Sequence, residues 1–92
     1  MTTEEAFVKA LQTHGIENAF GIIGSAFMPI SDLFSKAGIT FWDVAHESNG
    51  GLIADGYTRA TGKIAMCIAQ NGPGITGLVT PIKTAYWNHT PM

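Results

Sequence analysis

Apolar and polar residues recur along the chain with two different periods, one typical of helices and one typical of short buried strands. The helical period predicts four helices, at Thr3 to about His14, Pro29 to about Lys36, Glu47–Thr61 and Gly72 to about Trp87. Short runs rich in branched, aromatic and small apolar residues separate them and predict strands at Asn18–Gly21, Ile39–Val44 and Ile64–Ala69.

The alternation of helix and strand indicates a parallel sheet built from crossover units. We therefore expect an α/β fold in three layers, α/β/α, around three parallel strands. The run Ile64–Ala69 is apolar at nearly every position, which is typical of a strand covered on both faces. Because the alternation calls for a fourth strand after His89–Met92, residues 1–92 are expected to be the N-terminal part of a larger domain, truncated before that strand.

Two details of the helices predict how they pack. Thr3 is expected to cap the first helix, whose apolar face consists of Ala6, Phe7, Ala10 and Leu11. Pro81 falls inside the last predicted helix, where the missing backbone N–H should produce a kink.

Composition narrows the class of protein. The 92 residues are 46 % apolar and 13 % charged, which excludes a disordered tail. The net charge of -2 offers no basic stripe for nucleic acid. Apolar runs stay well short of the roughly 20 residues that cross a bilayer, and the acidic N-terminus lacks a signal peptide's apolar core, so we expect a cytoplasmic protein. Cys67 is the single cysteine, and no Cys/His cluster has metal-ligand spacing.

Candidate chemistry gathers where the predicted strands end, because ligands of open parallel sheets bind beyond the carboxyl ends of the strands. Three loops meet there, at 21–24, 45–47 and 70–74, and two of them are rich in glycine. Neither glycine loop has the spacing of a dinucleotide or nucleoside triphosphate cradle. Glu47 allows two interpretations: a carboxylate that merely stabilises a helix N-terminus, or one that binds a protonated ring nitrogen.

The remaining ionisable residues favour structural roles. His46 is expected to be an exposed or hydrogen-bonded structural histidine, and Cys67 a small core residue. Asp55 and Arg59 stand four residues apart on one helix, which predicts an ion pair.

The motifs together resemble the thiamine-diphosphate enzymes of the acetolactate synthase and pyruvate oxidase superfamily, and specifically their N-terminal pyrimidine-binding domain. The resemblance rests on His46–Gly51, Ala54–Lys63, the pair Phe20-Gly21 and the run Asn71–Gly74, and it extends over essentially the whole chain. It implies that Glu47 is catalytic, by a hydrogen bond to N1′ of the cofactor's aminopyrimidine ring.

The resemblance also implies further contacts and partners. Ile23 and Gly24 would lie against the pyrimidine and Pro73 would shape its other side, although relatives commonly have proline-glycine at 23–24 and asparagine where Gly77 stands. Magnesium and the diphosphate would be bound by a domain outside these residues, contributed by another subunit of a homodimer or homotetramer. Residues 1–92 alone are therefore expected to be catalytically silent.

Within the superfamily, the chain most resembles the sulfoacetaldehyde acetyltransferases. The shared features are Ala19–Ser25, Phe41–Asp43, Gln70–Gly74 and Tyr86–Pro91. This implies conversion of sulfoacetaldehyde and phosphate into acetyl phosphate and sulfite. Two alternatives stay open: an acetolactate synthase-like enzyme acting on pyruvate, and a truncated module that folds or binds without catalysis.

Overall fold

The computed structural model describes the whole chain, Met1–Met92. Its three strands are β1 (Asn18–Gly21), β2 (Thr40–Asp43) and β3 (Met66–Ile68). They are parallel and lie in the order β2–β1–β3, so that Ala19 of the central strand pairs with Phe41 on one side and Met66 on the other. The parallel sheet predicted from the alternation of helix and strand is confirmed.

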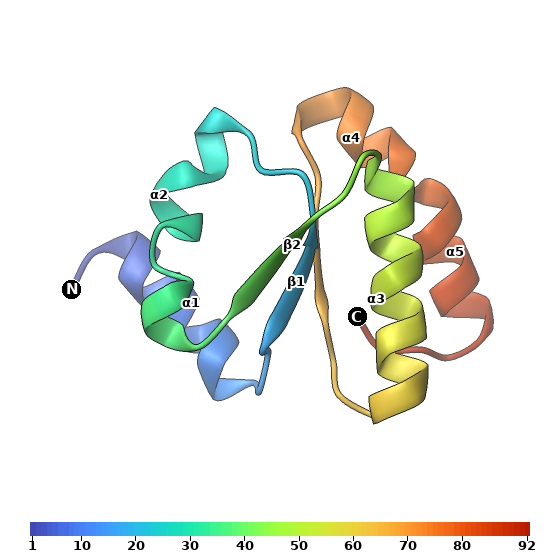
Figure 1. Ribbon diagram of the computed structural model, residues 1–92, viewed down its shortest axis with the longest axis horizontal. Helices are drawn as coiled ribbons and strands as arrows, with labels where there is room; N and C mark the ends of the chain where they lie inside the picture. The colour runs from blue at the N-terminus through green and yellow to red at the C-terminus, as the bar shows by residue number, and fades with distance from the viewer.

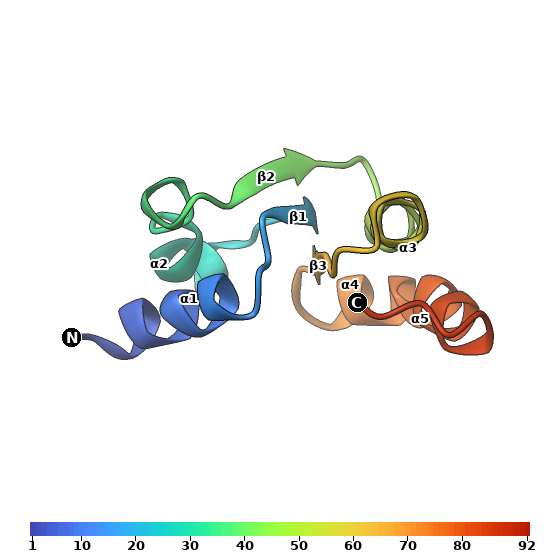
Figure 2. The same ribbon diagram turned by 90° about the horizontal axis from the view of Figure 1, so that it is seen from below.

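Helices cover both faces of this sheet. Helices α1 (Thr3–Thr13) and α2 (Met28–Ser31) lie on one face, while α3 (Glu47–Thr61) and α5 (Val79–Trp87) lie side by side on the other (Figure 1 and Figure 2). A shorter helix, α4 (Asn71–Gly77), leads from β3 into α5. The three-layer α/β/α arrangement is therefore as predicted. None of the helices has both the length and the apolarity that a membrane crossing requires.

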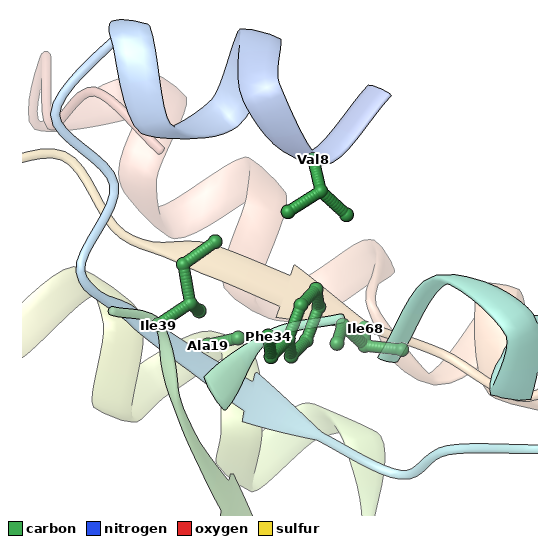
Figure 3. Close-up of a cluster of buried hydrophobic side chains, with 5 residues drawn as sticks. All are labelled: Val8, Ala19, Phe34, Ile39 and Ile68. Atoms are coloured by element: carbon green, nitrogen blue, oxygen red, sulfur yellow. The ribbon is translucent and has the colours of Figure 1, made fainter. Parts of the chain in front are cut away.

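The main core lies between the sheet and α1 with α2. It consists of Val8, Ala19, Phe34, Ile39 and Ile68, all nearly inaccessible to solvent (Figure 3). Of the predicted apolar face of α1, Leu11 packs against this core, whereas Phe7 is 44 % exposed; the buried residue of the helix is Val8, which the prediction did not include. The cap of α1 also shifts by one residue: Thr2 and Glu5 form a reciprocal capping box.

A second, smaller core lies on the opposite face of the sheet, under α3. It contains Phe20, Ala54 and Ala65, with the ring of Tyr57 tilted against that of Phe20 at 5.8 Å between centroids. Successive residues of β1 alternate between the two cores, Ala19 facing the first and Phe20 the second. Only 17 of 92 residues are buried, so each core is thin.

Two predicted helices are divided in the structure. In place of one helix over residues 29–36, the chain forms a 3₁₀ turn at Ser25–Phe27, the short α2, and a second 3₁₀ turn at Ser35–Ala37. These turns bring Phe34 edge-on against Phe27, at 5.9 Å between ring centroids, and so into the core. The local helical pattern could not anticipate this tertiary contact.

The last predicted helix is divided at Leu78 into α4 and α5. Pro81 is the third residue of α5, and the division at Leu78 lies three residues before it, because Pro81 has no backbone N–H to donate to the carbonyl of Gly77 four residues earlier. Its ring is fully buried and packs against Gly51 of α3. The prediction of full cover for β3 is also corrected, since Met66 and Cys67 remain partly exposed on this edge strand.

Candidate functional site

Glu47 is the first residue of α3, directly beyond the carboxyl end of β2. The preceding residue, His46, caps the helix by accepting a hydrogen bond at Nδ1 from the backbone N–H of Ser48, at 3.1 Å. Helix α3 then runs very close to β1: a Cβ on Gly50 would lie 3.1 Å from the Cα of Gly21. This close approach positions the start of α3, and with it Glu47, over the end of the central strand.

The Glu47 carboxylate is held from one side only. Its Oε2 accepts a hydrogen bond from the backbone N–H of Gln70 at 3.2 Å, and no other hydrogen bond of the chain reaches the carboxylate. The residue is half-buried and lies in the first turn of α3, at the positive end of the helix dipole. One oxygen of an oriented carboxylate is therefore left for a ligand.

The two glycine loops come up against this carboxylate. The side-chain amide of Gln70 lies in the space that a Cβ on Gly24 would occupy. A Cβ on Gly74 would likewise collide with Glu47 Oε2. The three loops that sequence reasoning placed at one edge of the sheet are thus brought together, with Gln70 between them. No role was predicted for Gln70, although its position between β3 and the Asn-Gly-Pro-Gly run places it at the end of a strand.

Ile23 and Pro73 are placed differently from Gly24. The Ile23 side chain packs against the main core, so at this position only the backbone can face the site. Pro73 is exposed in the first turn of α4, next to Gly74. Their contacts with a pyrimidine stay predictions.

The absence of a side chain at Gly77 has a local explanation. The ring of His46 lies over Gly77, with its Cε1 3.2 Å from the position of a Cβ there. An asparagine, as the resemblance led us to expect, would meet that ring. His46 is exposed and hydrogen-bonded, as predicted, both as the helix cap and through Ser48 Oγ at 2.8 Å.

Other candidate residues lie away from Glu47. Asp55 and Arg59 form the predicted ion pair, at 3.1 Å between Oδ2 and Nη2. Burial raises the pKa of the Cys67 thiol above its ordinary value, which is typical of a packed rather than a reactive cysteine. No three His, Cys, Asp or Glu side chains stand close enough together to hold a metal ion.

The site is an open surface on this chain. The largest cavity, about 750 Å³, lies at the opposite end of the sheet among Gly15, Gly38, Gly62 and Lys63, and Glu47 does not line it. A cofactor site needs directed polar groups as well as volume, and the Glu47 edge supplies such a group.

The residues at this edge fit an aminopyrimidine. A ring nitrogen that carries a proton matches the free oxygen of Glu47, and charge-assisted hydrogen bonds of this kind are strong away from water. Because Gly24 and Gly74 carry no side chains, the Gln70 side chain and the Glu47 carboxylate can lie directly against the two glycine loops. The carboxylate, its backbone support and the glycine loops can together bind and orient such a ring.

Comparison with known proteins agrees with this geometry. The chain is 78 % identical over all 92 residues to a sulfoacetaldehyde acetyltransferase of Roseovarius nubinhibens and 75 % identical to one of Rhodobacter capsulatus. It is 39 % identical to a probable acetolactate synthase large subunit of Methanococcus aeolicus. The chain spans only 15 % to 16 % of the length of these relatives. Since the family model for the N-terminal TPP-binding domain of thiamine pyrophosphate enzymes matches residues 1–92, the chain belongs to that family.

Proposed function

We propose that these residues form the pyrimidine-binding part of a thiamine-diphosphate site, in which Glu47 hydrogen-bonds to the protonated N1′ of the aminopyrimidine. The observation that carries the proposal is the half-satisfied carboxylate: Gln70 fixes one oxygen by a 3.2 Å bond and the other has no partner. Backbone atoms of Gly24 and the side chain and backbone near Pro73 would flank the ring, with Ile23 contributing through its main chain.

The role of Glu47 is to hold a proton at N1′. A carboxylate at the start of α3 stabilises the positive charge on the ring through a charge-assisted hydrogen bond. When bound, thiamine diphosphate supplies a nucleophilic carbon that attacks carbonyl substrates. The residues of this chain bind and orient the ring.

For the complete protein we propose conversion of sulfoacetaldehyde and phosphate into acetyl phosphate and sulfite. The names of the relatives at 73 % to 78 % identity support this reaction. The second candidate is an acetolactate synthase-like reaction on pyruvate, favoured by relatives at 39 % to 43 % identity that bear that name.

The partner we propose is the diphosphate-binding domain of another subunit in a homodimer or homotetramer, which would also hold magnesium. An apolar stripe on α4 and α5 supports a protein partner. Its members are each half or more exposed and recur at spacings of three and four residues: Ile75, Val79, Ile82 and Tyr86. Exposed apolar stripes of this kind are typical of surfaces that another chain covers. A cytoplasmic location goes with this proposal.

The proposed reaction is tested by product analysis on the complete protein with thiamine diphosphate, magnesium and phosphate. We expect sulfite and acetyl phosphate in equal amounts from sulfoacetaldehyde. Carbon dioxide release from pyruvate at the higher catalytic efficiency would favour the second candidate instead. Absence of both activities from a protein that binds the cofactor would contradict both reactions.

A further inference from the structure

His46 is the N-cap of α3 and directly precedes Glu47. Its Nδ1 atom lies 3.1 Å from the backbone nitrogen of Ser48 and 2.8 Å from Ser48 Oγ. A backbone N–H can only donate, so Nδ1 must accept and carries no proton, and the hydroxyl of Ser48 then donates to it as well. Both contacts therefore require the neutral form of His46, with the ring proton on Nε2.

The ring of His46 also connects α3 with α4. Its Cε1 atom lies 3.2 Å, and its Nδ1 atom 3.8 Å, from the position of a Cβ on Gly77, the last residue of α4. The carboxylate of Glu47 meets the opposite end of α4, where it accepts from the backbone N–H of the N-cap residue Gln70. Two consecutive residues thus contact both ends of one helix, which ties the direction of the Glu47 carboxylate to the position of the His46 ring.

A proton on Nδ1 would remove the cap. The protonated ring has two N–H donors and no acceptor, so the backbone N–H of Ser48 would lose its partner. The ring would also bring a positive charge to the positive end of the α3 dipole, which is unfavourable. Because Glu47 is the first residue of α3, loss of the cap loosens the backbone that holds the carboxylate.

The ionisable groups next to His46 are two carboxylates. Strand β2, which leads into the capping loop, ends at Asp43, and Glu47 follows His46 in α3. Helix α4, which the ring contacts, contains no ionisable side chain. Both carboxylates are present in the parent protein and in every His46 variant, so a difference in pH dependence between these proteins belongs to His46.

We propose that His46 is a positioning residue for Glu47, and that thiamine diphosphate binds more tightly while the His46 imidazole is neutral; this inference rests on the proposed function. Histidine side chains gain a proton as the pH falls from about 8 to about 5. Since binding needs an ordered start of α3, the cofactor affinity should decrease as the pH falls through this range. In this role His46 acts through Glu47 and needs no contact with the cofactor.

The test measures the Kd of thiamine diphosphate by fluorescence titration of the complete protein with magnesium, from about pH 8 to about pH 5.5. The parent is compared with His46→Asn and His46→Leu. Asparagine is a strong N-cap that does not titrate, whereas leucine fills space but accepts no hydrogen bond. His14→Asn is the matched control, because His14 ends α1 and lines the cavity at the opposite end of the sheet.

At about pH 8, His46→Asn should bind the cofactor as the parent does, and His46→Leu should bind about fivefold more weakly, the effect of one lost cap. On acidification, the Kd of the parent should rise more than the Kd of His46→Asn. His14→Asn should follow the parent at every pH. If His46→Leu does not fold, the comparison of the parent with His46→Asn decides by itself.

Three results would overturn the inference. The first is a Kd of His46→Asn that rises with acidification as steeply as that of the parent. The second is a His46→Leu protein that binds as tightly as the parent at about pH 8. The third is a His46→Asn protein that binds no better than His46→Leu, because capping would then not be the role of the imidazole. Each leaves the proposed function standing if the parent binds the cofactor and Glu47→Gln loses turnover, so the two failures are distinguishable.

Discussion

Replacing Gly51 by alanine tests how tightly α3 and α5 pack. A Cβ at Gly51 would lie 2.5 Å from both Cβ and Cγ of Pro81, and 3.4 Å from Cδ2 of Leu78. The proline ring is rigid and fully buried, so the two helices would have to separate by roughly 1 Å to restore ordinary contact. Overpacking of this kind typically destabilises by about 1–3 kcal/mol.

Gly56 supplies a matched control on the same helix. Nothing lies within 4 Å of a Cβ at Gly56, so Gly56→Ala should stabilise the chain by about 0.5–1 kcal/mol through helix propensity alone. Because Gly51→Ala gains the same propensity, the difference between the two variants isolates the overpacking, at about 1–3 kcal/mol.

Urea unfolding followed by circular dichroism measures both free energies of unfolding, with unchanged m-values as the sign that the unfolded state is not affected. Equal stability of Gly51→Ala and Gly56→Ala would refute the close packing of α3 on Pro81.

Three further predictions concern the site and the ion pairs. Gly74→Ala places a methyl group against Glu47 Oε2 and should weaken thiamine diphosphate binding at least tenfold in a fluorescence titration, whereas Gly72→Ala, with open space around it, should bind normally. Arg59→Leu leaves the buried Asp55 carboxylate without its ion pair and should lower the free energy of thermal unfolding by about 1–2 kcal/mol. The expected loss is limited to this range because Arg59 is half exposed. An unchanged free energy of unfolding would contradict the pairing. The hydrogen bond and charge of Glu17 raise the pKa of Lys63 above its ordinary value of 10.5. Any free energy of unfolding that this pair contributes is therefore present in full at neutral pH and is lost as the pH rises through the raised pKa. The stability of Lys63→Met should lack this part of the decrease at alkaline pH.

The predictable parts of this fold are those that local chemistry determines. Helix α3 begins at Glu47 and ends at Thr61, as the sequence predicts, because Gly62 adopts the left-handed conformation that ends a helix. The strand Asn18–Gly21 also has its predicted bounds. The gathering of the three loops follows from the rule that carboxyl ends of parallel strands share one edge.

The errors arise where tertiary contacts decide between local alternatives. Phe7 and Val8 of α1 are both apolar, and only the position of the helix over the sheet buries Val8 and leaves Phe7 exposed. The burial of Pro81 depends on the packing of α5 against Gly51 of α3. Likewise, the reach of Gln70 to Gly24 joins positions 46 residues apart, and no local pattern encodes it.

The most direct test of the central claim is the turnover of Glu47→Gln in the complete protein at saturating thiamine diphosphate. Glutamine can still hydrogen-bond to the ring but supplies no charge to hold the proton at N1′. We expect turnover to fall by about a hundredfold or more, with folding and the near-ultraviolet spectrum of the protein unchanged. Turnover close to that of the parent protein would contradict the assignment of Glu47 as the group that activates the cofactor.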